Sequence, residues 1–531
     1  MKTLRNVCLT LALLVSAFCF VLTFTLVSPI ASAQERSGVY AISDNQGAYD
    51  GSGIDWILDH ATATQFVLFG EQHGIAGIAE ITASVYDSLQ QAGFSHLVLE
   101  MDRWSVARIE ALGLDAFVES SPHAIAFGSD GDLQLITTAL DSSLDSSLDS
   151  SPDNSEGRIW GLDQIITAMH PFERLAEIAP NANARRLARG AFQKATLRMG
   201  EYLREEHFAD LDRIEAAFGE AIPEEAALLL NDLRSSMEIY TTWRAGQRGE
   251  ISTSISPAMR EAMMKDRLDS YLASHGDNAR AVFKMGGAHT MNGIGPNGVE
   301  TLGEHARARA SNNGRETLSI GIRAYNQDAA FPPAGFFDSA EIILIDVIEY
   351  QQARNLDSSL PPPGQYDNQF DALIYLQNPQ RAPGTRLAQS ERNFRNAFIA
   401  SLALPAALAL LLLSSIIPML IALFRKPANG PVLPLAISTL VATALALLFA
   451  LQVYALINYP SLPAAIMPAG SSLWLFVAGL VAAILVIGLQ YQAWQKHWWS
   501  AALRSYQTLL ATAIIVFVTV LYYWNLGGML A

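Results

Sequence analysis

Cysteine is nearly absent from this chain: Cys8 and Cys19 are its only two, and both lie within residues 1–33. That segment combines a basic start, a long apolar run and Ala31-Ser32-Ala33, the pattern of a secretory signal peptide cleaved before Gln34. If the segment stays uncleaved, it serves as a membrane anchor instead. A cleaved product has no cysteine, which excludes disulfides, zinc thiolates and a thiol nucleophile.

Acidic residues are missing from the C-terminal quarter, where no Asp or Glu follows Glu391. Four apolar stretches there are each long enough to span a bilayer. Basic residues after the first and third stretches predict that those loops are cytoplasmic. Because the stretches contain no ionisable side chain, an anchor or a bundle that faces lipid or a partner is favoured over a transporter. The stretches cover about Ala397–Phe424, Val432–Ile457, Leu473–Ala493 and Leu509–Leu526.

These patterns predict residues 34–384 as an extracytoplasmic α/β domain, residues 385–396 as a tether and residues 397–531 as four transmembrane helices. The predicted location is the cytoplasmic (inner) membrane, with the N-terminal domain outside, in the periplasm of a Gram-negative cell. The formal net charge is −16, and neither terminal segment carries an acidic residue, so the negative charge is concentrated in the α/β domain. That charge argues against nucleic acid as a partner and makes bound cations plausible.

Three common catalytic signatures are also absent. The chain has no Gly-x-Ser-x-Gly elbow, no Walker loop and no His-Glu-x-x-His helix. Serine-triad hydrolysis, nucleotide hydrolysis and zincin chemistry therefore lack their usual residues.

Four predicted strands each end in an ionisable residue: Gln65–Gly74, His96–Asp102, Ile159–Asp163 and Ala281–Thr290. They alternate with helical stretches, and further apolar runs at Thr317–Ile322, Ile342–Val347 and Ala372–Leu376 are candidate strands. This alternation predicts an α/β fold with a mostly parallel sheet. In such a sheet, ligands bind just beyond the carboxyl ends of the strands. The four strand ends therefore predict one shared crevice.

Two segments interrupt the alternation. Residues 141–157 are a near-perfect repeat of serine and aspartate, which predicts a disordered loop, with a calcium-binding loop as the alternative. Residues 171–275 read as helices without a strand, which predicts a large helical lobe inserted between the third and fourth strands. Such a lobe often covers a crevice and shapes its specificity.

Two glycine-flanked motifs carry the strongest functional signals, Gly70–Gly74 (GEQHG) and Gly286–Thr290 (GGAHT). Glycines permit a tight turn and close backbone approach beside each imidazole. In the first motif, Glu71 and His73 can converge on one water or one metal ion. In the second, His289 follows an apolar strand directly.

Carboxylates and one arginine complete the candidate residues. Glu100 closes the second strand and can orient an imidazole, bind a cation or act as an acid or base. Asp163 has a similar position, but it also suits an N-cap of the helix that follows, as does Asp102. Arg260 lies in the helix before the fourth strand, where a surface ion pair is the simplest role.

At these residues the chain resembles a superfamily that joins the erythromycin esterase-like hydrolases, the ChaN-type haem-binding proteins and the Tiki/TraB metalloprotease-like proteins. Their shared opening is a strand ending in Gly-Glu-x-His, a helix, a Gly-Phe pair and a strand closing in Glu. The segments LFGEQHG, Ala92–Phe94 and HLVLEMD match that opening. The esterase-like members continue with features that are matched in order by Trp160–Asp163, Arg260–Met264, His289, Leu302-Gly303 and Phe370–Leu376.

The resemblance spans about residues 65–377 and implies that Glu71, His73, Glu100 and His289 belong to the site. It adds weight to Arg260, and Asp163 is a weaker candidate. Two features depart from the esterase pattern: GGAHT stands where those enzymes carry a His-Asn-x-His type of segment, and a membrane bundle is not part of the usual enzymes.

The sequence therefore predicts a membrane-anchored extracytoplasmic hydrolase of a small-molecule ester, lactone or amide. His73 or His289 would activate water, and Glu71 and Glu100 would orient it. The sequence leaves open whether Glu71, His73, Glu100 and His289 also bind a divalent Mn, Co or Zn ion. A haem- or iron-binding protein of the ChaN type is the alternative function, and a structural membrane protein with a decayed site is a third.

Overall fold

The computed structural model describes residues 38–45, 47–120, 125, 128–141, 157–338, 340–424, 431–458 and 471–526. The predicted signal peptide and most of the serine–aspartate repeat lie outside these residues. The chain divides into two compact units. The first comprises the residues up to Leu114, Ile125–Asp163 and Ala245–Arg386, and the second comprises Asp115–Ala124, Gln164–Arg244 and the residues from Leu387 onward.

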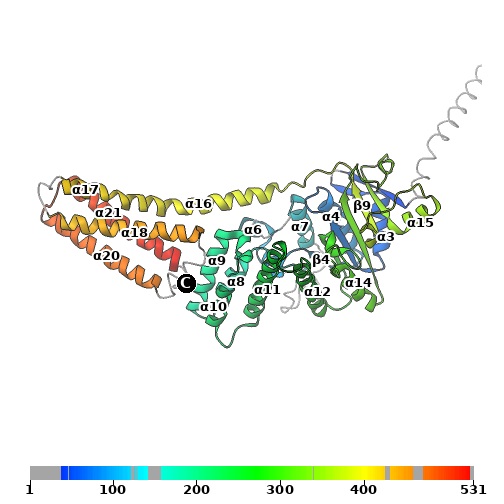
Figure 1. Ribbon diagram of the computed structural model, residues 1–531, viewed down its shortest axis with the longest axis horizontal. Coiled ribbons are helices and arrows are strands. Elements are labelled where there is room, and N and C mark those ends of the chain that lie inside the picture. The colour runs from blue at the N-terminus through cyan, green and yellow to red at the C-terminus, as the bar shows by residue number, and fades with distance from the viewer. Residues whose placement is uncertain are drawn as a thin grey trace, which may run out of the picture. The chain divides into compact units, whose positions relative to one another are not determined.

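A nine-stranded sheet forms the centre of the first unit, with the strand order β2-β1-β8-β9-β7-β3-β6-β4-β5 (Figure 1). Neighbouring strands are antiparallel from β2 to β9 and parallel from β9 to β5. The mostly parallel α/β sheet predicted from the sequence is therefore confirmed. The strands are β1 (Val39–Asn45), β2 (Ala48–Asp50), β3 (Thr64–Glu71), β4 (His96–Leu99), β5 (Ile159–Gly161), β6 (Ala281–Gly286), β7 (Glu316–Ala324), β8 (Ile342–Asp346) and β9 (Ala372–Leu376).

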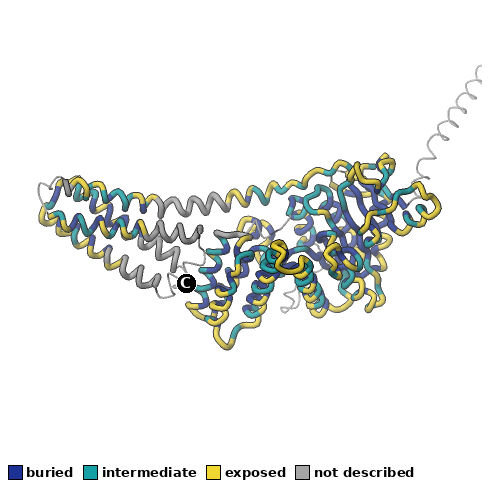
Figure 2. The backbone as a smooth tube through the Cα atoms, viewed as in Figure 1, coloured by how far each residue is buried: buried dark blue, intermediate teal, exposed yellow. Residues whose placement is uncertain are grey.

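The first unit surrounds this sheet with helices, and its strands form the most continuous buried region of the chain in Figure 2. In β3, every residue from Thr64 to Gly70 is buried, as expected for a strand covered on both faces. Apolar side chains at helical spacing on α12 and α14 pack against β3 and β6. The helices are α3 (Ser52–Ala61), α4 (Ile78–Gln90), α5 (Arg103–Leu112), α7 (Asp130–Asp141), α12 (Ile255–His275), α13 (Gly287–Thr290), α14 (Leu302–Asn312) and α15 (Val347–Leu356).

Alternation along the central strands decides where their polar residues point. Phe66 and Leu68 of β3 lie in the core with α12 and α14, so Glu71 projects toward the opposite face of the sheet. Phe283 of β6 lies in the same core, which turns Lys284 toward that opposite face as well. An ion pair between Lys284 and α7 shows that this helix covers that face.

Helices are the regular elements of the second unit in the residues that the structure describes. The four apolar stretches predicted as membrane spans lie in helices: the first is divided between α16 and the nine-residue α17, and the others lie in α18, α20 and α21. In the part of the chain that the structure describes, no helix combines the length and the apolar character that crossing a bilayer requires. The predicted membrane spans are therefore not supported. The helices are α6 (Leu114–Ser120), α8 (Met169–Glu177), α9 (Ala182–Arg198), α10 (Phe208–Phe218), α11 (Glu224–Gln247), α16 (Thr385–Ser414), α17 (Ile416–Phe424), α18 (Leu433–Asn458), α20 (Ser471–Gln495) and α21 (Ala501–Leu526).

Candidate functional site

The carboxyl ends of β3, β6, β4 and β5 lie side by side in that order. Glu71 ends β3 and is level with Gly286 at the end of β6. Glu100 follows β4, Asp163 follows β5 and His289 lies in α13, directly after β6. The residues that the sequence singled out therefore share one edge of the sheet.

Glu71 and His73 form the first pair of the site. His73 Nδ1 lies 2.8 Å from Glu71 Oε1, and donation from this nitrogen makes Nε2 the basic nitrogen of the ring. Burial alone would raise the pKa of Glu71, but the Lys284 ammonium and His73 lower it to about 2. Burial alone would lower the pKa of His73, but the bond to Glu71 and the charge of Glu100 raise it above its ordinary value.

A buried ion triad lies behind this pair. Lys284 Nζ is 2.7 Å from Glu71 Oε2 and 2.6 Å from Asp132 Oδ1. Asp132 is in the first turn of α7, and its Oδ2 accepts from the backbone N–H and the hydroxyl of Ser129. Burial alone would lower the pKa of Lys284, but the two carboxylates raise it above its ordinary value. The lysine therefore stays charged with 6% of its side chain exposed.

Arg260 connects three other residues at the same edge. Its Nε donates to Asp163 Oδ1 over 2.7 Å and its Nη2 to Asp163 Oδ2 over 2.5 Å, a paired geometry that suits the planar guanidinium. Nη2 also donates to Glu100 Oε1 over 2.6 Å, and Nη1 lies 3.1 Å from His289 Nε2. Burial opposes the charge of Arg260, but Asp163 and Glu100 raise its pKa. Arg260 is thus the centre of a network and no surface ion pair.

Glu100 joins the two parts of the site. Its Oε2 accepts from the backbone N–H of Gly286 over 2.7 Å and lies 3.7 Å from His73 Nε2. Burial alone would raise the pKa of Glu100, but Arg260 and the two imidazoles lower it. An ionised Glu100 therefore stands between the Glu71–His73 pair and the Arg260 network.

His289 makes contacts through both ring nitrogens. A guanidinium can only donate, so His289 Nε2 accepts from Arg260 Nη1. The ring hydrogen then lies on Nδ1, which bonds to Glu261 Oε1. Glu261 is next to Arg260 in α12, and its other oxygen accepts from the backbone N–H of Leu302 over 2.8 Å. This arrangement holds His289 between Glu261 and Arg260, where it helps to orient the guanidinium.

The two aspartates at strand ends have different roles. Asp102 is the N-cap of α5, where its side chain accepts from the backbone N–H of Trp104 and of Ser105. Asp163 does not take the alternative role of an N-cap, because the next helix is α8, which begins at Met169 with Ala168 as its N-cap. Asp163 is 1% exposed and pairs with Arg260 instead. A buried carboxylate needs such a partner, since an unpaired buried charge is costly.

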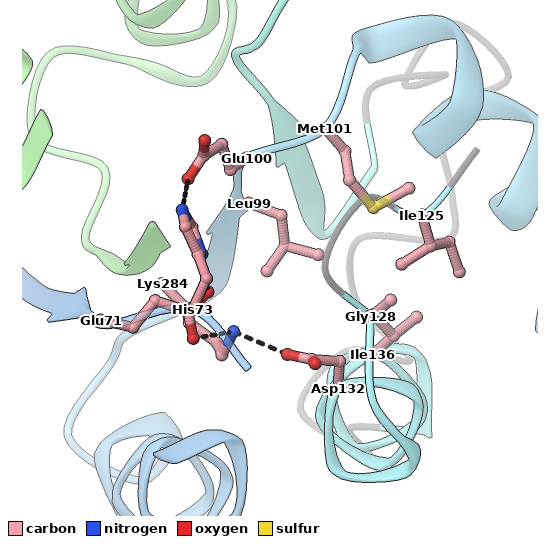
Figure 3. A pocket seen from close by; sticks show the side chains of 10 residues that line it. All are labelled: Glu71, His73, Leu99, Glu100, Met101, Ile125, Gly128, Asp132, Ile136 and Lys284. Carbon is pink, nitrogen blue, oxygen red and sulfur yellow. Dashed lines mark hydrogen bonds and ion pairs between the residues drawn. The ribbon is translucent and has the colours of Figure 1, made fainter. Parts of the chain in front are cut away.

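A pocket of about 40 Å³ opens beside the network. Figure 3 shows Glu71, His73 and Lys284 on one side of Leu99, and Met101 and Ile125 on the other. Asp132, from the helix that also carries Ile136, reaches across to Lys284. This volume accommodates a few water molecules or one small group of a substrate. The lining residues are Glu71, His73, Glu100, Asp132 and Lys284, with Leu99, Met101, Ile125, Gly128 and Ile136.

The donors of the site do not fit a metal ion. Among the described residues, no group of three or more His, Cys, Asp or Glu is arranged to hold one. The carboxylates of Glu71, Glu100 and Asp163 are bonded to Lys284 or Arg260, so their charge is already neutralised. We therefore assign no metal ligands.

Three residues of the network are not predicted by the sequence: Asp132, Glu261 and Lys284. Lys284 had a signal, because a lysine inside the apolar run of β6 must find a partner once the strand is buried. Glu261 is adjacent to Arg260 and on the same helix. Asp132 has no comparable signal, since α7 comes near β6 only through packing.

Neither the comparison with protein-family models nor the comparison with curated proteins gives a match. Solved structures of similar fold include a protein from Bacillus cereus, with 16% identity and a TM-score of 0.42, which covers 66% of this chain and 97% of its own. A succinoglycan biosynthesis protein gives 14% identity and a TM-score of 0.44 over the same shares of the two chains. A mutant of the erythromycin esterase EreC in its open conformation gives 13% sequence identity and a TM-score of 0.39. The match covers 62% of this chain and 95% of the EreC chain.

Proposed function

We propose that this protein is a hydrolase in which His73 is the general base that activates a water molecule. The observation that carries the proposal is the 2.8 Å contact between His73 Nδ1 and Glu71 Oε1. It orients the ring and makes Nε2 the nitrogen that takes a proton, at the wall of a pocket. Although burial lowers the pKa of His73, its two carboxylate neighbours raise it above 6.5, toward the range in which a base works at neutral pH.

In the proposed reaction, Nε2 takes a proton from water while the water oxygen bonds to the carbonyl carbon of an ester, lactone or amide. The carbonyl electron pair moves to its oxygen and then reforms the double bond as the bond to the leaving group breaks. His73 returns its proton to the leaving oxygen or nitrogen, so atoms and charges balance. Arg260 does not line the pocket, but it bonds Glu100, which does, and 25% of its side chain is exposed. We therefore assign Arg260 to stabilise the developing negative charge.

His289 is less suited to be the base. Its Nε2 accepts from Arg260, and its Nδ1 bonds to Glu261. The lone pair of Nε2 is therefore already used by the guanidinium and is not directed at a water molecule in the pocket. We therefore assign His289 to the orientation of Arg260. Placement outside the cytoplasmic membrane and the identity of the small-molecule substrate stay predictions, and no contact at the site favours the haem-binding alternative.

The test is hydrolysis of a panel of small esters, lactones and amides by the full-length chain. We expect His73→Ala to lower kcat/KM by about 10²–10⁴-fold, the usual contribution of a general base. His305→Ala is the matched control, because His305 of α14 pairs with Asp269 of α12, outside the network. Activity should survive EDTA. No turnover of any compound, or equal rates for the wild type and His73→Ala, would contradict the proposal.

A further inference from the structure

The ion triad behind the proposed base consists of Lys284, Asp132 and Glu71, from β6, α7 and β3. Lys284 Nζ bonds both carboxylates, at 2.7 Å and 2.6 Å. Glu71 uses its other oxygen for His73. The three charges and the imidazole therefore form one continuous chain of contacts, which runs from the first turn of α7 to the wall of the pocket.

We propose that Lys284 and Asp132 are positioning residues for His73: they fix the orientation of the Glu71 carboxylate, and the balance of their charges sets how tightly the imidazole binds a proton. The inference rests on the proposed function only in calling His73 the base. The protonation of the ring can be measured without a substrate.

Packing alone does not explain the triad. Lys284 is 6% exposed, Glu71 9% and Asp132 15%, so all three charges have lost most of their water. Replacing such a buried group of charges by apolar residues of similar volume is often neutral or stabilising. Stability alone therefore does not explain a lysine at this position of β6. Lys284 does, however, keep the Glu71 carboxylate ionised and fixed beside the imidazole of His73.

The geometry also predicts the sign of each residue's effect. Lys284 contributes a positive charge near the ring, so its removal should favour the imidazolium. Asp132 offsets part of that positive charge, so its neutralisation should disfavour the imidazolium. The other charged groups in contact with the ring are Glu71 and Glu100, and Arg260 and His289 lie behind Glu100 and contact it. All four are the same in both variants.

The experiment is a proton NMR titration of the full-length chain labelled with ¹³C-histidine, with the His73 signal identified from its loss in His73→Ala. Lys284→Met should raise the titration midpoint of His73 by about one pH unit, and Asp132→Asn should lower it by a smaller amount, roughly half a unit. Lys265→Met is the control, because Lys265 pairs with Glu300 at the surface. It should leave the midpoint in place.

Opposite shifts are the decisive result, since a purely structural role would move both variants the same way or not at all. Unchanged midpoints, or shifts of the same sign, would overturn the inference. If Lys284→Met does not fold, Asp132→Asn still decides, because a midpoint that rises or stays in place contradicts it. Where hydrolysis is measurable, the acid limb of the pH profile of kcat/KM should move with the midpoint. Opposite shifts without any hydrolysis would contradict the proposed function and leave the inference standing.

Discussion

Arg260 is the residue on which the charges of the site converge. One planar guanidinium bonds both oxygens of Asp163, one oxygen of Glu100 and Nε2 of His289. A lysine could replace the charge but not the geometry, since an ammonium is a point donor without a fixed fork. The positions of Glu100 and His289 therefore depend on the shape of Arg260 as well as on its charge.

Arg260→Lys should accordingly lower kcat by about 10²-fold while the protein stays folded, because small misplacements of catalytic groups cost that much. Steady-state kinetics and circular dichroism would test this. Arg309→Lys is the matched control, because Arg309 of α14 pairs with the partly exposed Asp269 of α12. This variant should stay close to the wild-type rate. A rate for Arg260→Lys equal to that of the control would show that only the charge of Arg260 matters.

A site residue can be predicted from the sequence when it directly follows an apolar run, because that run shows which strand end the residue occupies. Glu71, His73, Glu100 and His289 each follow an apolar run, and the topology of parallel sheets brings such ends together. Lys284 and Asp132 lack that property. Whether a strand lysine meets a carboxylate depends on the register of β3 with β6 and on the approach of α7, and these are set by tertiary packing.

At the scale of elements, the turn from β6 into α13 controls the space around His73. A Cβ on Gly286 would lie 2.9 Å from His73 Nε2 and 3.3 Å from Glu100 Oε2. A Cβ on the neighbouring Gly287 would meet its nearest atom, the carbonyl oxygen of Gly70, at an ordinary 3.5 Å. The paired glycines of the GGAHT motif therefore have different roles. Only Gly286 leaves the space that the imidazole of His73 occupies.

Gly286→Ala should displace the imidazole and lower kcat/KM by about tenfold or more, because the methyl group occupies the space at Nε2. Gly287→Ala should fold and react like the wild type. Kinetics and thermal unfolding of the two variants, measured side by side, would test this pair. Similar losses in both would mean that the turn as a whole is sensitive and that contact with His73 is not the cause.

The elements also show where sequence patterns end. The predicted strands from Gln65 onward all exist, because each is a buried apolar run bounded by polar residues or glycine. The hairpin of β1 and β2 is not predicted, since most residues of both strands are half-buried or exposed and give no apolar run. The sequence pattern also misplaces the start of the helix after Asp163. That pattern made Asp163 suitable as an N-cap, but α8 starts at Met169, several residues later.

At the scale of the whole molecule, the charges of the site link stability to pH. Glu71 ordinarily titrates near 4.5, but its pKa in the folded protein is about 2, because the attraction of Lys284 and His73 exceeds the cost of burial. A depressed carboxylate stabilises the fold fully above the ordinary pKa, and this stabilisation is lost as the pH falls toward the depressed value. The difference corresponds to about 3 kcal/mol.

Glu71→Gln should therefore be less stable than the wild type by about 3 kcal/mol near pH 6, and the gap should narrow steadily between pH 4.5 and 2. Urea unfolding at a series of pH values, followed by tryptophan fluorescence, measures this gap. Glu238→Gln, at an exposed position of α11, is the control. The difference between its unfolding free energy and that of the wild type should not change with pH. A gap for Glu71→Gln that stays constant with pH would indicate that the side chain acts through its shape and hydrogen bonds, and that its charge contributes nothing to the stability of the fold.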